Sequence, residues 1–290
     1  MNTRNQLNGS LVMKPIRTLI LVAAVLVVVV APTQVMAQTV TLSLASPENG
    51  ATIVVGQTIH WSIEFTVSQG DNEGLALLTA DLTQASTNPV TIDIPPATAV
   101  PPEMNNFARP AGITNPGGVN PVDGYMGVQR GPGGAQNLMQ IGGAQNTFGV
   151  ARPSGAGIAE NTTVSGGIGQ SGSVLLTSGS FNASAACGAY SFSLANAMAN
   201  VLTSVQSPPA QSLVAEATVA IGTGSFTVNI IPVADLNADC AVDPVDAELM
   251  VGVLIGTVSD PLTVSGADLN HDGQLNGLDV QSFVNAALAP

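Results

Sequence analysis

The stretch Thr58-Ile59-His60-Trp61-Ser62-Ile63-Glu64-Phe65-Thr66-Val67 alternates polar and apolar side chains without a break. Successive side chains of a β-strand point to opposite faces, so this period of two places every apolar residue on one face. The polar residues between them, which include His60 and Glu64, face water on the other side. The stretch therefore predicts a strand in a sheet that has one buried and one solvated face.

Shorter alternating runs lie on both sides of this strand. They cover residues 39–44, 90–94, 173–181, 190–194, 213–221 and 226–230, and residues 75–78 form a short apolar run. Aromatic residues make up only 3% of the chain, whereas 31 Gly and 19 Pro supply turns. The predicted fold class is therefore mainly β, with an antiparallel β-sandwich over residues 38–231.

Regular alternation is interrupted by a long insert rich in Gly and Pro, over residues 97–172. It contains a short repeat, since Gly133-Gly134-Ala135-Gln136-Asn137 recurs as Gly142-Gly143-Ala144-Gln145-Asn146. An insert of this length inside a compact domain is either functional or partly disordered. Scattered apolar residues favour the interpretation that it folds back onto the sandwich.

Residues 1–37 have the pattern of a secretory signal peptide. Lys14 and Arg17 precede an apolar run from Leu19 to Ala31, and Val35-Met36-Ala37 offers small residues before a cleavage after Ala37. An N-terminal membrane anchor is the alternative, but the run is shorter than the roughly 20 residues of a membrane span. Met13 is an alternative start. We expect a secreted protein, extracellular or at the cell surface, with no membrane segment after cleavage.

The formal net charge of -13 argues against nucleic acid as a partner, because an acidic surface repels phosphate. The acidic residues are concentrated near the C-terminus, where nine of the 19 lie between Asp235 and Asp279. No Lys or Arg accompanies them in that segment. Regularly spaced carboxylates without basic neighbours indicate a divalent cation.

Two twelve-residue loops, which start at Asp235 and at Asp268, repeat one spacing of oxygen-bearing side chains. Calcium takes six to eight oxygen ligands, and loops of this kind supply them from positions 1, 3, 5, 7, 9 and 12. In the first loop we predict these ligands, of which Ala241 offers its carbonyl and Asp243 binds directly or through water: Asp235, Asn237, Asp239, Ala241, Asp243 and Asp246. The second loop assigns the same roles to Asp268, Asn270, Asp272, Gln274 (carbonyl), Asn276 and Asp279. The sequence thus predicts two Ca²⁺ sites; acidic turns without metal are the alternative.

The two loops differ at position 6, where the chain usually needs Gly because it takes a positive φ. Gly273 meets this need in the second loop, but Cys240 occupies the position in the first. Cys187 and Cys240 are the only cysteines. Because thiols oxidise outside the cell, one disulfide between them is the favoured interpretation, and two buried thiols are the alternative. A strained backbone at Cys240 weakens the first site unless that disulfide holds the conformation.

An apolar run at helical spacing follows each loop, with Leu249 and Met250 after the first and Phe283 and Val284 after the second. The segment from Asp235 to Leu288 resembles a type I dockerin, the duplicated EF-hand-like module of secreted bacterial proteins. The resemblance implies calcium binding and docking onto a cohesin domain, with specificity at positions 10 and 11 of each loop. Those positions are Pro244-Val245 and Gly277-Leu278 here, in place of the hydroxyl residues typical of the family. The sandwich is similar in general pattern to cohesin-like or other immunoglobulin-like surface domains.

The domain organisation predicted from the sequence is a signal peptide (1–37), a sandwich (38–231) and a small α-helical dockerin-like calcium module (232–290). No histidine base stands beside a nucleophile in the sequence, because His60 lies in a strand and His271 inside a loop. We therefore expect a non-catalytic secreted protein whose tail docks it onto a protein partner, such as a cohesin-like domain, or onto its own sandwich. The alternative is a carbohydrate-binding or glycoside-hydrolysing protein of a polysaccharide-degradation system.

Overall fold

The computed structural model describes residues 38–86, 89–96, 100–108, 128–130, 137–149, 162–184 and 186–288. The predicted signal peptide, residues 1–37, lies outside these residues, as do parts of the predicted insert. Within the described part of the chain, no helix is both long enough and apolar enough to cross a membrane.

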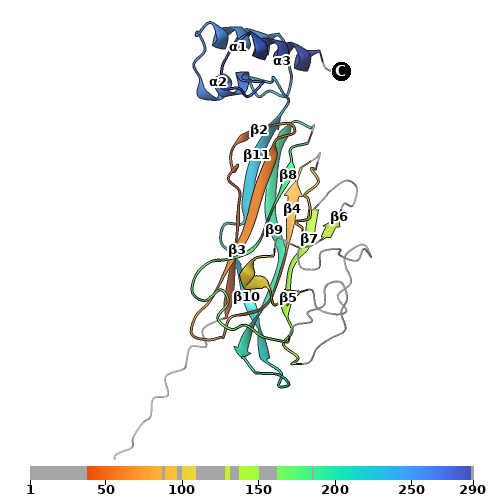
Figure 1. Cartoon of the computed structure of the whole chain (residues 1–290), viewed down its shortest axis with the longest axis vertical. Coiled ribbons are helices and arrows are strands. Elements are labelled where there is room, and N and C mark those ends of the chain that lie inside the picture. The colour runs from red at the N-terminus through yellow and green to blue at the C-terminus, as the bar shows by residue number, and fades with distance from the viewer. Residues whose placement is uncertain are drawn as a thin grey trace, which may run out of the picture. The chain divides into compact units, whose positions relative to one another are not determined.

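The described residues form strands first and helices last (Figure 1). The strands are β1 (Thr39–Ala45), β2 (Thr52–Val54), β3 (Thr58–Val67), β4 (Leu75–Ala85), β5 (Phe107–Ala108), β6 (Val128–Arg130), β7 (Asn137–Gln145), β8 (Val174–Asn182), β9 (Gly188–Ser204), β10 (Leu213–Ile221) and β11 (Ser225–Ile231). The helices are a short 3-10 turn, η2 (Pro102–Met104), and α1 (Pro244–Leu254), α2 (Pro261–Ala267) and α3 (Gly277–Ala287). The molecule is mainly β, as the sequence predicts.

The strand predicted from Thr58 to Val67 is confirmed as β3. Its apolar side chains are all buried, and Trp61 is only 1% exposed, whereas His60 and Glu64 face solvent. Burial of one face of a ten-residue strand removes several large side chains from water, each worth about 1.5–3 kcal/mol. This face fixes which side of the sheet becomes the core.

The strands join into one sheet that curls back on itself, in the order β5-β7-β4-β9-β10-β1-β3-β8, with β2, β6 and β11 off this path. Pairing is mostly antiparallel, as predicted, except for the parallel pairs β1–β10 and β2–β11. The curl brings Phe181 of β8 against Phe192 of β9, with ring centroids 5.0 Å apart. Both layers of the sandwich therefore contribute to a single core.

Part of the predicted insert belongs to the sheet. Residues 137–145 form β7, which pairs with β4 along its length. The Gly-Gly of the short repeat explains this packing, because a Cβ on Gly142 would lie 2.1 Å from the Leu78 carbonyl oxygen. A Cβ on Gly143 would lie 2.5 Å from the Ala108 carbonyl oxygen. These glycines let neighbouring backbones approach, so a stretch without apolar alternation still forms a central strand.

The alternating residues 90–94 do not form a strand, contrary to the sequence prediction. Only Thr91 makes an isolated bridge. The Gln84 side chain accepts a hydrogen bond from the Val90 N–H at 2.8 Å and donates one to the Val90 carbonyl at 2.7 Å. A side-chain amide thus takes the backbone groups of Val90 that a neighbouring strand would otherwise use.

Asp81 of β4 is a buried carboxylate that joins the two neighbouring strands. It accepts a hydrogen bond from the Gln140 N–H on β7 at 2.7 Å and one from Asn196 Nδ2 on β9 at 2.7 Å. Both partners have positive φ, 55° at Gln140 and 49° at Asn196, and the β4–β7 and β4–β9 registers shift beside Asp81. The Asp81 carboxylate therefore stabilises two backbone irregularities, one in each strand that neighbours β4.

We predict that Asp81→Asn lowers the free energy of unfolding by about 1–3 kcal/mol, because an amide offers one acceptor where two donors converge. Chemical denaturation followed by fluorescence of Trp61, the single tryptophan, measures the change. Asp93→Asn, at an exposed position, is the control and should change stability by less than about 0.5 kcal/mol. Equal effects of the two substitutions would contradict this role of Asp81.

Candidate functional site

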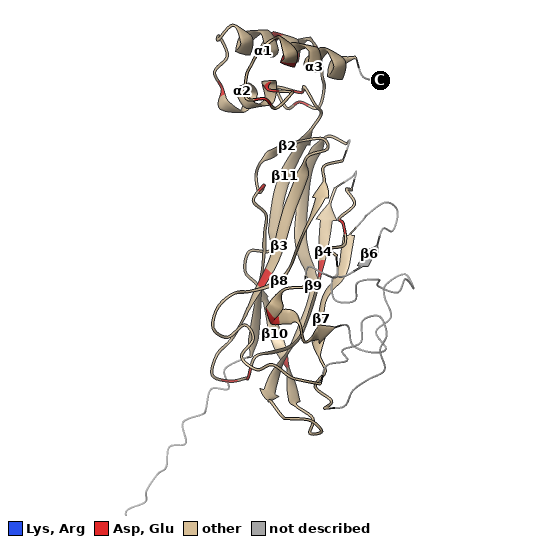
Figure 2. Ribbon diagram, viewed as in Figure 1, with Lys and Arg blue, Asp and Glu red and all other residues tan. Residues whose placement is uncertain are grey.

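The C-terminal residues 232–288, called here the helical tail, have a hydrophobic core of their own. It consists of six buried residues: Ala234, Leu236, Met250, Val253, Ala267 and Phe283. This cluster is separate from the core of the sandwich. The tail also carries the predicted calcium loops, and Figure 2 shows its acidic residues in and beside the loops that connect the helices.

The first residue of each loop accepts two backbone N–H groups from the turn that follows it. Asp235 accepts hydrogen bonds from the Asp239 N–H at 3.2 Å and the Cys240 N–H at 2.9 Å. In the second loop Asp268 accepts the equivalent bonds from Asp272 and Gly273, at 3.2 and 2.9 Å. Each carboxylate therefore folds its loop into a tight turn.

The last residue of each loop closes the turn from the other end. Asp246 is fully buried and accepts hydrogen bonds from the backbone N–H groups of Asn237, at 3.2 Å, and Asp243, at 2.9 Å. Asp279 is equally buried and accepts the matching bonds from Asn270 and Asn276, at 3.3 and 2.9 Å. The predicted position-12 ligands are thus held where each helix begins.

Positions 3 and 5 are joined within each loop. Asn237 accepts the Asp239 N–H at 3.0 Å and donates its own amide to the Asp239 carboxylate at 2.8 Å. Asn270 and Asp272 repeat both bonds, each at 3.0 Å. The position-5 carboxylate then accepts the N–H of position 7, which is Ala241 at 2.9 Å or Gln274 at 2.8 Å. Hydrogen bonds therefore link the residues of positions 1, 3, 5 and 12 in both loops.

Position 9 has a role that the ligand pattern did not predict. Asp243 and Asn276 are the N-caps of α1 and α3, and each accepts the N–H of the residue two positions on, at 2.7 and 2.8 Å. With Asp246 and Asp279 they form capping boxes. An acidic or amide residue three positions before an Asp at a helix start is the sequence signal of this arrangement. These position-9 side chains are directed to the helix N-termini.

The backbone follows the same course in both loops. Position 4 has φ of 58° at both Ala238 and His271, and position 6 has φ of 75° at Cys240 and 77° at Gly273. The requirement for a positive φ at position 6 is therefore present in both loops. Cys240 meets it although its Cβ makes this conformation unfavourable.

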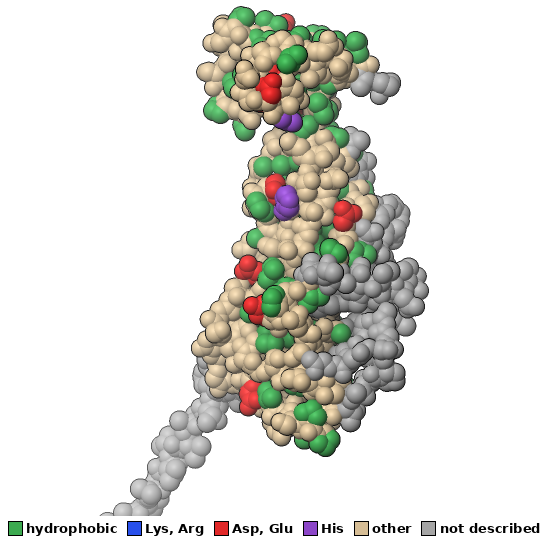
Figure 3. Space-filling model, viewed as in Figure 1, with side chains coloured by type: hydrophobic (Ala, Val, Ile, Leu, Met, Phe, Trp, Pro, Cys, Tyr) green, Lys and Arg blue, Asp and Glu red, His purple; other side chains and the backbone are tan. Residues whose placement is uncertain are grey.

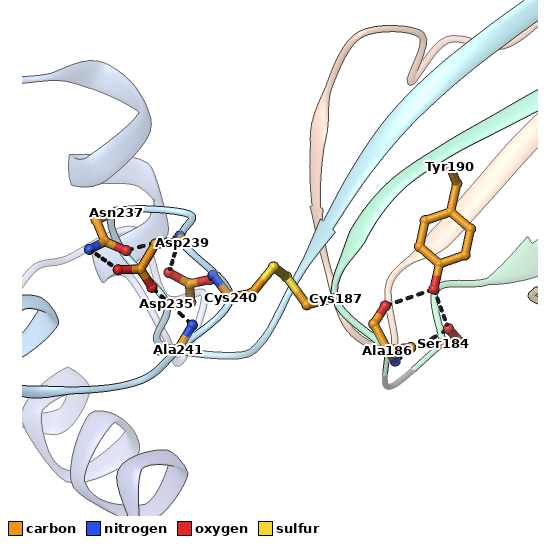
Figure 4. The surroundings of a disulfide bond; sticks show 9 residues. All are labelled: Ser184, Ala186, Cys187, Tyr190, Asp235, Asn237, Asp239, Cys240 and Ala241. Atoms are coloured by element: carbon orange, nitrogen blue, oxygen red, sulfur yellow. Dashed lines mark hydrogen bonds between the residues drawn. A yellow bond between two sulfur atoms is a disulfide. The ribbon is translucent and has the colours of Figure 1, made fainter. Parts of the chain in front are cut away.

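Cys240 is joined to Cys187 by a disulfide, which connects the helical tail to the segment before β9 (Figure 4). The described residues contain no free cysteine. Beside Cys187, the Tyr190 hydroxyl donates to the Ala186 carbonyl at 2.8 Å. The residue at position 6 of the first loop is therefore covalently fixed to the sandwich.

The loops carry several carboxylates, and the sequence has no Lys or Arg after Arg152. Burial raises the pKa of Asp235, and the charges of Asp246 and Asp239 raise it further, against hydrogen bonds from the Cys240 and Asp239 N–H groups. Among the described residues, no three His, Cys, Asp or Glu side chains are grouped closely enough to hold a metal by themselves. A cation in either loop therefore also needs the amide and main-chain oxygens of the predicted set.

The helices of the tail differ in two ways from the sequence prediction. The apolar run after the second loop predicts a helix with one buried face, but only Phe283 is buried, while Val284 and Leu288 are exposed. A third helix, α2, lies between the loops and was missed. Its signal is Asp260-Pro261, because Asp260 caps the helix through the Thr263 N–H at 2.9 Å and Pro suits the first helical position.

The sandwich carries a shallow depression of about 380 Å³, lined by Pro47, His60, Trp61, Ser62, Ser178, Gly179 and Ser180. His60 lies opposite Ser180 in the β3–β8 register, and its Nδ1 is 3.0 Å from Glu48 Oε1. Burial raises the pKa of Glu48, but hydrogen bonds from His60 and Ser46 outweigh it and lower the pKa below its usual value. The sequence did not show that His60 lies beside Ser178 and Ser180, because β8 is distant from β3 along the chain.

No protein-family model matches the chain, and no curated protein matches it in sequence. Solved structures that match include the seventh ScaB type I cohesin of Pseudobacteroides cellulosolvens, at 10% identity and TM-score 0.34, over 67% of this chain and 92% of that one. The Coh-OlpC–Doc435 complex, a type I cohesin–dockerin complex of Clostridium thermocellum, matches at 7% identity and TM-score 0.30, over 67% and 94%. A non-cellulosomal cohesin of Archaeoglobus fulgidus matches at 10% identity and TM-score 0.28, over 67% and 91%.

We predict that Phe283→Ala unfolds the helical tail, because loss of a buried Phe costs about 3–5 kcal/mol and the tail core is small. The helical circular dichroism signal should fall, while the denaturation midpoint followed by Trp61 fluorescence stays unchanged. Val284→Ala, the exposed neighbour on the same helix, is the control and should retain the helical signal. A common shift of both signals in Phe283→Ala would show that the two cores do not fold independently.

Proposed function

We propose that this chain is a secreted, non-catalytic, calcium-binding protein whose dockerin-like tail docks it onto a protein partner. The observation that carries the proposal is the equivalence of the two loops. They share a positive φ at positions 4 and 6 and equivalent hydrogen bonds at positions 1, 3, 5, 7, 9 and 12. A geometry that occurs twice, with acidic side chains and no Lys or Arg, fits a cation.

The donor chemistry of each loop fits calcium, which is a hard cation that prefers carboxylate, amide and carbonyl oxygen. The first site would be held by Asp235, Asn237, Asp239, Ala241 (carbonyl), Asp243 and Asp246. The second would be held by Asp268, Asn270, Asp272, Gln274 (carbonyl), Asn276 and Asp279. Bound calcium would neutralise the crowded carboxylates and stabilise the fold of the tail.

Docking is supported by a second repeat, of exposed apolar residues in α1 and α3 and at their C-terminal ends. Three pairs of apolar residues occupy equivalent positions after the two loops: Val245 and Leu278, Val251 and Val284, and Ile255 and Leu288. All six are between 40% and 78% exposed. We call them the paired helix face, and Figure 3 shows hydrophobic side chains exposed over the helical tail. Exposed apolar residues that recur at equivalent positions are typical of a surface that a protein partner covers.

A second candidate function is carbohydrate binding or hydrolysis at the sandwich. The depression beside His60 favours it, because an imidazole and three serine hydroxyls line one concave surface. Such groups can exchange hydrogen bonds with sugar hydroxyls. Calorimetric titration with soluble polysaccharides, and an assay for released sugar, test this candidate. Binding that His60→Ala abolishes would favour it over docking alone.

We predict that the chain binds two calcium ions and that chelation lowers the melting temperature of the helical tail. Asp239→Ala and Asp272→Ala, at exposed position-5 carboxylates, should each reduce the stoichiometry to one in isothermal titration calorimetry. Glu248→Ala removes an exposed carboxylate of α1 outside the loops and should leave it at two. Absence of any calcium-dependent heat in the unsubstituted chain would rule out the metal assignment.

We predict calcium-dependent capture of a partner through the paired helix face. The immobilised chain should retain a specific secreted or surface protein from its own organism in calcium and release it with chelator. Val251→Asp with Val284→Asp should abolish the capture by placing charges in the contact. Leu262→Asp, at a more exposed apolar residue on α2 outside this face, should not. Retention by the double variant would exclude this face as the docking surface.

A further inference from the structure

The two loops differ at the residue whose backbone turn is least favourable for an ordinary side chain. Cys240 and Gly273 have nearly the same φ, 75° and 77°, and both N–H groups donate to the first carboxylate of their loop at 2.9 Å. Gly adopts this conformation freely, whereas a residue with a Cβ rarely does. At position 6, therefore, the second loop has a residue that adopts the turn freely, whereas the first has a residue with a Cβ in the same conformation.

The position-6 conformation affects the predicted ligands on both sides of it. The Cys240 N–H orients the Asp235 carboxylate, and the next N–H, that of Ala241, donates to Asp239 at 2.9 Å. A turn of the Cys240 backbone to negative φ would therefore break the contact with Asp235. It would also redirect the carbonyl of Ala241, the position-7 ligand. Both effects would weaken calcium binding by the first loop, although every ligand side chain would still be present.

The sandwich end of the disulfide is firmly held. Cys187 precedes Gly188, which pairs with Ile230 near the end of β11, so it lies where the chain leaves the sandwich for the tail. The buried Tyr190 fixes the same segment, since its hydroxyl bonds the Ala186 carbonyl at 2.8 Å and the Ser184 hydroxyl at 3.1 Å (Figure 4). The disulfide thus connects position 6 of the first loop to the residue directly before β9, in a segment that Tyr190 ties by hydrogen bonds.

We propose that Cys187 is a positioning residue for the first calcium site: its disulfide holds Cys240 in the positive-φ conformation that the site requires. The proposal rests on the calcium binding proposed above. It makes the affinity of the first loop dependent on the disulfide and that of the second loop independent of it. Reduction by an external dithiol, which breaks the S–S bond with two electrons and two protons and leaves two thiols, would weaken only the first site.

The test compares three variants by calcium titration of the full chain, followed by NMR of the position-6 amides, which report each loop separately. Cys187→Ser should weaken calcium binding at the first loop at least tenfold and leave the second unchanged. The double variant Cys187→Ser with Cys240→Gly also lacks the disulfide, but it places a glycine at position 6 of the first loop. Because glycine adopts a positive φ freely, the affinity of the first loop should recover to within about threefold of the original value. Gly273→Ala, the matched control, should weaken the second loop alone.

Each outcome is decisive, because the second loop serves as an internal reference for calcium binding and for the folding of the tail. Unchanged affinity of the first loop in Cys187→Ser would overturn the proposal while calcium binding at both loops stands. Failure of the glycine variant to recover would also overturn it, since the disulfide would then act otherwise than through position 6. If neither loop of the unsubstituted chain bound calcium, the proposed function itself would be wrong.

Discussion

The helical tail depends on buried carboxylates that accept backbone N–H groups. Asp246 and Asp279 are wholly buried, and each closes a loop while it completes the cap of the helix that follows. A buried carboxylate is costly unless its oxygens find hydrogen bonds or a counter-charge. Here the backbone supplies the hydrogen bonds, and residues 232–290 contain no Lys or Arg. The same residues therefore define the local fold and are the ones that the proposed calcium ions would contact.

Patterns with a strict period could be read from the sequence. The alternation of Thr58–Val67 predicted β3, and the repeated spacing from Asp235 and Asp268 predicted two loops of equal geometry. Features set by distant contacts could not be read in this way. Residues 137–145 form a strand because Gly142 permits a close approach to Leu78, and Val90 leaves the sheet because the Gln84 side chain takes its hydrogen bonds. The first contact joins distant parts of the chain, and the second joins a side chain to the backbone six residues later, which the alternation of residues 90–94 does not reveal.

In the candidate site, too, some features could be predicted from the sequence and others could not. Ligand positions follow a spacing, so the sequence predicts twelve ligand residues, and their role in calcium binding stays a prediction. The N-cap role of Asp243 and Asn276 was overlooked because one residue serves two patterns, the calcium loop and the capping box. The depression beside His60 was invisible in the sequence, since Ser178 and Ser180 join it only through the pairing of β3 with β8.

The parallel pair of β1 and β10 has a consequence for the order in which the protein is built. Thr39–Leu42 pair with Thr218–Ile221. The first strand of the sandwich therefore cannot complete its pairing until β10, one of its last strands, has been synthesised. Contacts this far apart in the chain close slowly, because a long loop must be ordered before they form. A growing chain that lacks β10 would leave β1 unpaired along one edge. The sandwich can thus complete its sheet only after nearly all of it has been synthesised, and the tail follows last.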